Sequence, residues 1–361
     1  MRALSRLRSE RVHVAEPNGG NGRGATLEEV ARAAGVSRAT VSRVVNGNTK
    51  VSPAVRRLVE REVARLGYVP NPAARSLVTR RSQSVGLVIG EPAARLFEDP
   101  FFPRLIRSIG AELASRELQL VLLMPLSPAE ESRIERYLTA GHVDSVLLVS
   151  LHGDDPLPAA LARRGIPVVV GGRPPASADV SYVDVDNVQG ARSAVEHLLK
   201  RGRRVVATIA GPLDMGAGTD RLAGYRQALD AAGRQRDAGL EAVGDFTQHG
   251  GESAMRRILA ARPDVDGVFA ASDLMAAGAI RALREAGRRV PDDVALVGFD
   301  DSPIATTTEP QLTSVRQPIE EMGREMVRLL DHARPAGGVA RRVVLATQLV
   351  PRHSSEGGPA S

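Results

Sequence analysis

The sequence predicts a small all-α N-terminal domain joined by a short connector to a larger α/β domain with parallel sheets. Two observations support this prediction. Apolar residues recur with helical spacing over residues 26–66. From Ser84 onward, short continuous apolar runs alternate with amphipathic stretches, which is typical of parallel strands covered by helices on both faces. At 361 residues the chain is also long enough for two or three domains.

Seven continuous apolar runs carry the α/β prediction, and stretches with helical spacing separate them. The region that contains them, residues 83–350, is longer than one doubly wound domain normally needs. We therefore expect two lobes with a cleft between them, in which a ligand binds outside the carboxyl ends of the strands. The predicted strands cover residues 85–89, 118–124, 144–150, 166–171, 204–211, 266–272 and 293–300.

The composition excludes several classes of protein. Hydrophobic residues make up 43% of the chain but aromatic ones only 3%, so its cores must be aliphatic. The absence of Cys excludes disulfides, thiolate metal sites and cysteine nucleophiles. The chain has no run of about 18 apolar residues that could span a membrane. Its N-terminus also lacks the apolar stretch of a secretion signal, so we expect a cytoplasmic protein without membrane contact.

No catalytic constellation is evident in the sequence. The seven His residues are scattered without metal-ligand spacing, and neither a P-loop nor a GxSxG elbow occurs. A Rossmann-type enzyme would carry GxGxxG after the first strand, where this chain has VGLVIGEPAARL. We therefore expect neither an enzyme nor a bound metal or cofactor.

Positive charge is concentrated at the N-terminus. Residues 1–24 carry five Arg and two Glu, or +3, and residues 25–82 carry eleven Arg or Lys and four Glu, or +7. The rest of the chain must carry −4, because the net charge is +6. A basic head on a mildly acidic body is typical of a nucleic-acid-binding protein with a separate second function. Charge alone leaves a solvated basic terminus as an equally good interpretation.

Three helices are predicted in the basic head from their capping residues. Thr26 and Glu29 have the spacing of a capping box. Ser37 can cap a second helix, and Ser52 followed by Pro53 can begin a third. The predicted helices cover residues 27–34, 38–45 and 53–66.

The chain after the third helix is expected to be an extended connector, because two Pro residues push the residues before them out of the helical region. Asn71 can then cap a short helical segment that runs to about Thr79. The predicted divisions are a disordered basic tail (1–24), the three-helix domain (25–70), the short helix and linker (71–82), the α/β domain (83–350) and a flexible C-terminal tail (351–361).

The segment TLEEVARAAGVSRATVSRVVNGNTKVSPAVRRLVEREVARLGYVPNPAARSL closely resembles, without a gap, the head of the LacI/GalR family of bacterial repressors. The rest resembles that family's two-lobed body, which is related to periplasmic sugar-binding proteins, so the resemblance covers about residues 25–350. It implies a helix-turn-helix head and a hinge helix joined to a periplasmic-binding-protein-like body. It also implies a transcription regulator, most simply a repressor, whose affinity for a palindromic operator in double-stranded DNA is switched by a small molecule such as a sugar.

The second helix of the head is expected to enter the major groove of DNA, with Val41, Val44 and Val45 packed inward. Arg43 is the first candidate for a bidentate contact to guanine, although a lone Arg on a helix face otherwise points to solvent. By resemblance, Arg38 and Ala39 also read base edges. The side chains better placed to bind phosphates are Ser37, Thr40, Ser42 and Asn46.

The resemblance assigns a further DNA contact to residues 71–77, which correspond to a hinge helix that orders when two subunits meet on DNA. Leu77 then corresponds to an apolar wedge that enters the minor groove and bends the duplex. The alternative is a linker helix whose Leu packs on the body. Because one head reads few base pairs, a homodimer on a palindrome is expected. The C-terminal sequence LVPRHSSEGGPAS lacks the heptads of the family's tetramers.

The resemblance to the family's body implies an effector site in the cleft that includes Asp300, Asp273, Arg221 and Phe246, and the types of these residues suit a polyol ligand. Asp300 and Asp273 can accept hydrogen bonds from adjacent hydroxyls. Arg221 has a fork of donors, and Phe246 offers an apolar face to a sugar ring. Asp273 has capping a helix as its alternative role, and Asp300 has a turn after its strand. By resemblance, the remaining effector-binding residues are Ser272, Gln317 and Phe101. A sugar, a sugar phosphate and a purine are all candidate effectors.

Effector binding is expected to change the affinity for DNA by shifting the population of two conformations of the body. Whether the effector releases or recruits DNA is left open by the sequence. A periplasmic-type solute receptor is the main alternative function, because the body alone would suit it. The head at residues 26–79 and the missing signal peptide argue against that alternative.

Overall fold

The computed structural model describes residues 25–47, 50–69, 81–125, 127–174, 178–333 and 339–356. The chain divides into two compact units, residues 1–80 and 81–361, which we call the head and the body. The predicted N-terminal tail and the predicted hinge helix with its wedge Leu77 lie outside the described residues.

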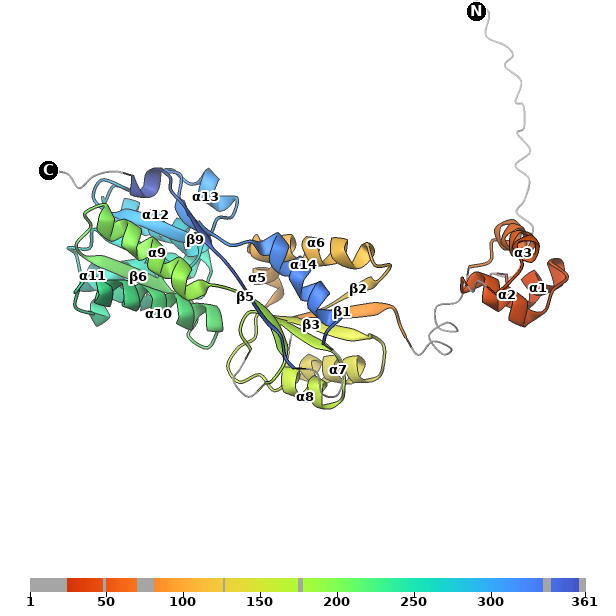
Figure 1. Cartoon of the computed structure of the whole chain (residues 1–361). Helices are drawn as coiled ribbons and strands as arrows, with labels where there is room; N and C mark the ends of the chain where they lie inside the picture. The colour runs from red at the N-terminus through yellow and green to blue at the C-terminus, as the bar shows by residue number, and fades with distance from the viewer. Residues whose placement is uncertain are drawn as a thin grey trace, which may run out of the picture. The chain divides into compact units, whose positions relative to one another are not determined.

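The described residues of the head form three helices, as predicted (Figure 1). Thr26 and Glu29 make the predicted capping box, in which each residue bonds the backbone N–H of the other. Gly35 makes the turn after the first helix with a φ of +61°, a conformation that favours glycine. The core of the head is aliphatic and contains Val30, Val41, Val44 and Val59. The helices are α1 (Leu27–Ala33), α2 (Arg38–Val45) and α3 (Pro53–Leu66).

The body consists of two lobes, each built on a six-stranded sheet, which confirms the two-lobed α/β prediction (Figure 1). The first sheet has the strand order β11-β5-β4-β3-β1-β2, and the second has the order β12-β10-β9-β8-β6-β7. The pairs within each sheet are parallel, except that β12 runs antiparallel to β10 at the edge of the second sheet.

The first lobe takes its strands from residues 84–185 and from one late segment. These strands are β1 (Ser84–Ile89), β2 (Gln119–Leu123), β3 (Ser145–Val149), β4 (Val168–Gly171), β5 (Ser181–Val185) and β11 (Arg342–Leu345). Its helices are α5 (Ala93–Glu98), α6 (Phe101–Ala114), α7 (Pro128–Thr139), α8 (Leu157–Arg163) and α14 (Ile319–Leu330).

The second lobe follows the same plan. Its strands are β6 (Val206–Ala210), β7 (Glu241–Val243), β8 (Gly267–Ala270), β9 (Ala295–Asp300), β10 (Thr313–Arg316) and β12 (Gln348–Val350). Its helices are α9 (Asn187–Lys200), α10 (Gly216–Ala231), α11 (Gln248–Ala261), α12 (Asp273–Glu285), α13 (Ile304–Thr307) and the 3₁₀ turns Ala238–Leu240 and His353–Ser355.

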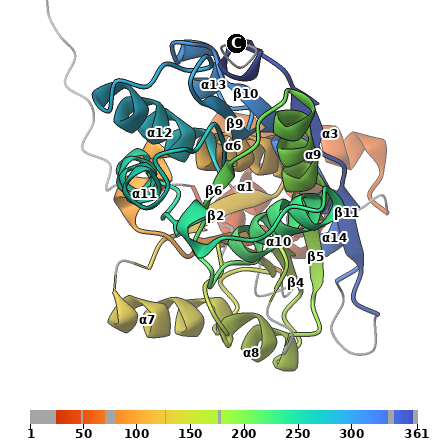
Figure 2. The ribbon, with the colours of Figure 1, turned by 90° about the vertical axis from the view of Figure 1, so that its left-hand side faces the viewer.

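The central strands of each sheet, β3 and β4 in the first lobe and β8 and β9 in the second, are buried on both faces because they are apolar on both sides. In β3, Leu147 packs with α6 and α14, whereas the next residue, Leu148, packs with α7 and α8 on the opposite face. Figure 2 shows α7 and α8 next to each other below the first sheet. In the second lobe, Val268 faces α11 and α12, and Phe269 faces α9 and α10. The continuous apolar runs therefore reflect two buried faces for each strand.

The chain crosses between the lobes three times. The crossings follow β5 at Asp186, follow β10 at Gln317 and Pro318, and lie between β11 and β12. The first two crossings bring polar side chains to the boundary between the lobes, so the effector cleft is lined from both sides.

The prediction of a flexible tail from residue 351 is wrong for residues 351–356. Ser354 and Ser355 are fully buried. The Ser354 hydroxyl donates a hydrogen bond to Leu296 O at 2.6 Å and accepts one from Thr313 N at 2.8 Å. Arg352 Nη2 lies 2.6 Å from Asp301 Oδ1. The segment is polar in sequence because it hydrogen-bonds to strand ends instead of packing through apolar side chains.

Five strands of the body are absent from the sequence prediction: β5, β7, β10, β11 and β12. They are short or carry polar residues, so they lack a continuous apolar run. The sequence of β5, Ser-Tyr-Val-Asp-Val, is the most informative case, because its buried Asp184 lies at the effector cleft. The seven predicted strands are all present.

Candidate functional site

The exposed face of α2 carries the side chains predicted to read bases. Arg38, Ala39 and Arg43 are exposed, whereas Val41 and Val44 are buried, as predicted. Arg38 Nη1 lies 3.0 Å from Glu28 Oε1 on α1. Both side chains are largely exposed, so this ion pair is weak and can be exchanged for DNA contacts.

The four residues predicted to bind phosphates also support the helix itself. Ser37 Oγ accepts a hydrogen bond from Thr40 N at 3.1 Å and lies 2.9 Å from Thr40 Oγ1. Asn46 Nδ2 donates to Ser42 O at 2.8 Å, which satisfies a carbonyl in the last turn of α2. These hydrogen bonds orient the polar side chains at the two ends of the exposed α2 face.

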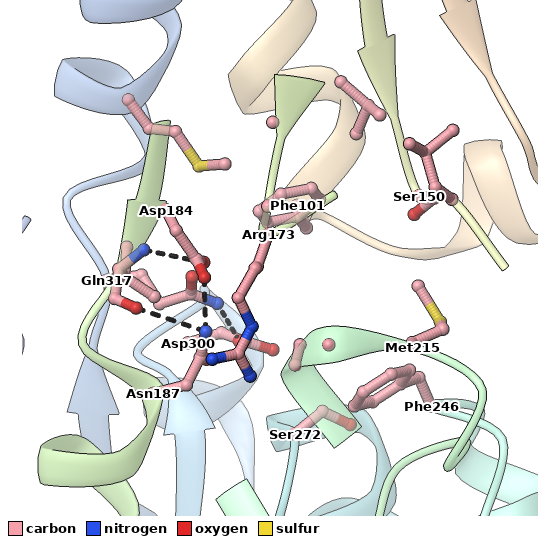
Figure 3. A pocket seen from close by; sticks show the side chains of 18 of the residues that line it. Phe101, Ser150, Arg173, Asp184, Asn187, Met215, Phe246, Ser272, Asp300 and Gln317 are labelled. Atoms are coloured by element: carbon pink, nitrogen blue, oxygen red, sulfur yellow. Dashed lines mark hydrogen bonds between the residues drawn. The ribbon is translucent and has the colours of Figure 1, made fainter. Parts of the chain in front are cut away.

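The body contains a cavity between its two lobes (Figure 3). It lies at the carboxyl ends of β3 and β4 in the first lobe and of β8 and β9 in the second, where the parallel fold predicts a ligand site. Six of the seven predicted effector-binding residues line this cavity: Phe101, Arg221, Phe246, Ser272, Asp300 and Gln317.

Arg221 is the centre of a buried polar cluster. Its Nε donates a hydrogen bond to Asn187 Oδ1 at 2.8 Å, and its Nη1 donates to Ala271 O at 2.6 Å. Arg221 Nη1 also lies 3.6 Å from Asp300 Oδ1. Gln317 Nε2 donates to the same Asp300 oxygen. The guanidinium of Arg221 also lies 3.7 Å from the ring centre of Phe299. The hydrogen bonds and this cation–π contact together hold the guanidinium in place.

Burial changes the protonation chemistry of the cavity. It raises the pKa of Asp300 well above the ordinary value, an effect that the positive charge of Arg221 opposes. Burial also raises the pKa of Asp184 to about 6. Asp184 Oδ1 accepts hydrogen bonds from Val185 N at 2.8 Å and Asn187 Nδ2 at 3.0 Å. These carboxyl groups and amides offer both acceptors and donors to a ligand with several hydroxyls.

Three non-glycine residues with left-handed backbone angles line the cavity. They are Ser150 with φ +57°, Phe246 with φ +64° and Asp300 with φ +111°. Such angles are costly for residues with a Cβ and are concentrated at functional sites. In Figure 3, Ser150 lies on the first-lobe side, whereas Phe246 lies on the second-lobe side beside Met215 and Ser272.

Asp273 is the predicted effector residue that the structure does not bring to the cavity. It is fully buried at the first position of α12. Its Oδ2 accepts a hydrogen bond from Ser302 N at 2.7 Å, and its Oδ1 accepts one from Ser314 Oγ at 2.5 Å. The carboxylate thus connects α12 to the segments around β9 and β10. Ser272 lines the cavity, but its Oγ also caps α12 by accepting from Met275 N at 3.2 Å.

The structure adds cavity residues that sequence reasoning did not select: Arg95, Asp99, Arg173, Asp184 and Asn187. Asp184 and Asn187 flank the end of β5, a strand that was not predicted. The only available signal was the polar pattern Asp-Val-Asp-Asn directly before a helix, which also fits an ordinary helix cap.

Ion pairs connect the lobes at the rim of the cavity. Arg173, which follows β4, pairs with Asp220 on α10. His152, which follows β3, places Nδ1 2.8 Å from Asp214 Oδ2 in the second lobe and Nε2 3.3 Å from Glu91 Oε1 in the first. Hydrogen bonding to Glu91, and then to Asp214, raises the pKa of His152 to about 9. These ion pairs favour the arrangement in which the two rims are close.

Neither a metal site nor a membrane span is found in the described parts of the chain. No group of three or more His, Asp or Glu there is arranged to hold a metal ion. Of the helices that the structure describes, none combines the length and the apolar character needed to cross a membrane.

Two family models match the chain. Residues 26–71 match the model described as bacterial regulatory proteins, lacI family, and residues 195–355 match a periplasmic binding protein-like domain. The chain is 53% identical over 332 residues to the HTH-type transcriptional regulator CelR of Thermobifida fusca, covering 91% of this chain and 98% of that protein. It is 34% identical over 312 residues to the ribose operon repressor of Escherichia coli (strain K12), covering 85% of this chain and 92% of that repressor.

Solved structures resemble the chain over nearly the same length. A transcriptional regulator CelR–cellobiose complex is 51% identical with a TM-score of 0.73, covering 91% of this chain and 99% of that chain. A lac repressor dimer bound to operator and the anti-inducer ONPF is 27% identical with a TM-score of 0.81, covering 93% and 100%. These comparisons favour a regulator over a periplasmic solute receptor, and the chain therefore belongs to the lacI family of bacterial regulatory proteins, as a DNA-binding transcription regulator with an effector-binding body.

Proposed function

We propose that this regulator is a homodimeric repressor whose operator affinity is controlled by cellobiose or a closely related β-linked glucose disaccharide. The observation that carries the proposal is the buried Arg221–Asp300 pair beside the ring of Phe246, in a cavity that both lobes line. The 53% identity to CelR supports the choice of sugar, because a related CelR structure is described as a cellobiose complex.

The charges around the cavity favour a neutral polyol over a phosphorylated ligand. Each arginine that lines the cavity already has a carboxylate partner: Arg95 pairs with Glu91, Arg173 with Asp220, and Arg221 with Asp300. Carboxyl groups of Asp99 and Asp184 line the same space. A phosphate would meet these acids without an unpaired cation to neutralise it, whereas sugar hydroxyls can donate to them.

The aromatic rings and polar side chains that line the cavity match the apolar faces and the hydroxyl-bearing edge of a pyranose. Phe246 presents an aromatic face, and Phe101 lines the cavity from the first lobe. Polar groups of Asp300 and Gln317 lie on the opposite side in Figure 3. A purine would fit the aromatic faces equally well, but its edges offer fewer hydrogen-bonding groups than a disaccharide does to the polar side chains that line the cavity. A ligand with many hydroxyls matches this polar lining better.

We propose that α2 reads operator bases through Arg43, Arg38 and Ala39. Exposure of these side chains on the face opposite the head core supports the proposal. The phosphate contacts are assigned to Ser37, Thr40, Ser42 and Asn46, whose oxygen and nitrogen atoms lie at the ends of the helix. The proposed minor-groove wedge, Leu77, lies outside the described residues, so it rests on sequence resemblance alone. Such a regulator acts on chromosomal DNA in the cytoplasm.

Apolar side chains on the first lobe support a homodimer. Phe97 on α5 is 72% exposed, and Leu122 on the edge strand β2 is 38% exposed. An edge strand and an exposed aromatic ring are costly to leave in water, and a second copy can cover both. In a dimer, a change in the angle between the lobes alters the surface that the partner contacts, which couples the effector to the spacing of the two heads.

Two measurements on the full chain test the proposed function. Isothermal titration with cellobiose, maltose, ribose, glucose 6-phosphate and guanine identifies the ligand class. Fluorescence anisotropy with a palindromic operator from the chain's own genomic neighbourhood then measures the effect of each ligand on DNA binding. We expect cellobiose to bind most tightly and to change operator affinity by about tenfold or more. Binding of a purine or a phosphorylated sugar in preference to cellobiose would refute the choice of effector.

A further inference from the structure

A second cavity adjoins the effector cavity. It is lined by side chains of both lobes, namely Glu98 on α5 and Thr247, Gln248 and Leu274 near the starts of α11 and α12. Three further residues line both cavities: Arg95, Asp99 and Phe246. These three residues therefore form the wall between the effector cavity and what we call the outer cavity.

Arg95 and Phe246 meet across this wall from opposite lobes. The guanidinium of Arg95 lies 5.1 Å from the ring centre of Phe246, which is within the range of a cation–π contact. Arg95 comes from the short helix α5, whereas Phe246 follows β7. The wall thus consists of a contact between lobes and changes whenever the lobes move.

The guanidinium of Arg95 is anchored at one end only. Its Nη1 donates a hydrogen bond to the buried carboxylate of Glu91 at 2.6 Å. Its Nε is buried and has no hydrogen-bond partner among the described residues. A buried N–H group without a hydrogen-bond partner lowers the stability of the protein. A ligand oxygen that accepts a hydrogen bond from Nε would remove this cost and would therefore bind favourably. The Nε of Arg95 therefore remains available to an acceptor on a ligand while Nη1 stays bonded to Glu91.

The outer cavity has the chemistry of a saccharide subsite. Thr247, Gln248 and Glu98 provide polar groups, and Leu274 provides an apolar surface. Glu98 and Gln248 are exposed, so the cavity opens to solvent and can be reached from outside. A sugar ring presents hydroxyls on its edge and C–H groups on its faces, which suits such a mixed lining.

We propose that Arg95, stacked on Phe246, is a specificity-determining residue that closes the end of the effector cavity and thereby limits the length of the saccharide that binds. When the wall is shortened, the effector cavity and the outer cavity join, and a third β-linked glucose unit is accommodated. This proposal rests on the proposed sugar effector. It adds a limit on the length of the saccharide that binds, and it attributes this limit to Arg95.

The test compares cellobiose with cellotriose on the full-length chain. Titration calorimetry gives the ratio of the two dissociation constants for the wild-type protein and for Arg95→Ala. We expect cellobiose to be preferred by the wild type and the ratio to move toward cellotriose by about tenfold or more in the variant. Arg164→Ala serves as a matched control, because Arg164 is 54% exposed on the same lobe and pairs only weakly with Glu135 at 3.5 Å.

Two further variants separate a specific effect from a loss of folding. Arg95→Lys keeps a positive charge beside Glu91 but lacks the planar group that stacks on Phe246, so its ratio should lie between those of the wild type and Arg95→Ala. Adding Leu274→Trp to Arg95→Ala fills the outer cavity and should abolish the gain for cellotriose while cellobiose still binds. Thermal unfolding of each variant reports whether the body remains folded.

The outcomes distinguish this inference from the proposed function. If the wild-type protein binds neither sugar, the proposed effector is wrong. If cellobiose binds but Arg95→Ala and Arg95→Lys change both dissociation constants by the same factor, the length limit is refuted and the effector stands. A gain for cellotriose that survives Leu274→Trp would also refute the role of the outer cavity.

Discussion

Arg221 Nη1 lies 3.6 Å from Asp300 Oδ1, and both side chains are buried where the two lobes meet. The pair is joined by Asn187 and Gln317, which lie at two of the three crossings between the lobes. A ligand that contacts this pair therefore lies beside two of the segments that connect the lobes. This arrangement gives the cavity a direct physical connection to the angle between the lobes.

We predict that Asp300→Asn weakens effector binding strongly. The substitution preserves shape but removes a carboxyl group whose pKa is raised to about 7. At about pH 8 it therefore removes a negative charge beside Arg221, and a hydrogen bond to a charged group contributes about 1.5–3 kcal/mol. Titration calorimetry with cellobiose should therefore give a dissociation constant at least about tenfold higher than that of the wild type. The exposed-site variant Arg164→Ala should bind cellobiose normally. Equal affinity of Asp300→Asn and the wild type would exclude Asp300 from the effector site.

We predict that Gly211→Ala disturbs effector binding through Phe246. A Cβ at Gly211 would overlap the Phe246 ring, so the ring must move. Because Phe246 is only 5% exposed, the ring has little room in which to shift. Cellobiose affinity should fall, whereas adding Gly211→Ala to a Phe246→Leu variant should lower the affinity little further than Phe246→Leu does alone. A variant that binds with wild-type affinity would show that the position of the ring does not matter.

We predict that His152 makes the stability of the body dependent on pH above neutrality. Glu91, followed by Asp214, raises the pKa of His152 to about 9, above its ordinary value of 6.5. The folded state therefore binds the proton more tightly than the unfolded state. The resulting stabilisation is fully present below about pH 6.5 and is lost as the pH rises through about 9.

Thermal unfolding from about pH 6 to about pH 10 tests this prediction. The wild-type Tm should fall more steeply at high pH than the Tm of His152→Gln, which keeps hydrogen-bonding groups but cannot take up the proton. The imidazole is 37% exposed, so solvent screening reduces the size of the difference. Parallel curves for the two proteins would mean that the ion pairs of His152 do not form in solution.

We predict that Arg43→Ala relaxes the operator specificity of the regulator. Loss of a bidentate contact to guanine costs about 1–3 kcal/mol at one base position. Operators that differ only at that base position should therefore bind the variant with similar affinity. Operators that differ at other positions should still bind with different affinities. Arg32→Ala provides the comparison, because Arg32 is exposed on α1, outside the recognition helix. A uniform loss of affinity for every sequence would instead assign Arg43 to a phosphate.

Local sequence signals predicted the three helices of the head and seven apolar strands of the body, but not the five shorter or more polar strands. The capping box at Thr26 and Glu29 and the αL turn at Gly35 involve residues that are close in sequence, so the pattern alone specifies them. The buried strands were evident because both of their faces are apolar. The polar strand β5 was missed because its Asp184 is buried by neighbouring segments and not by any property of the strand itself.

The sequence by itself determined the two-part layout, the helices of the head and the α/β body, because caps and hydrophobic periodicity act over a few residues. Only the tertiary structure decided which polar residues share the cavity. It placed Arg221 against Asp300 and added Arg95, Asp184 and Asn187, while Asp273 bonds Ser302 and Ser314 instead. The physical reason is that strands far apart in sequence meet at their carboxyl ends, and only their packing determines whether a buried carboxylate faces a ligand or a backbone N–H.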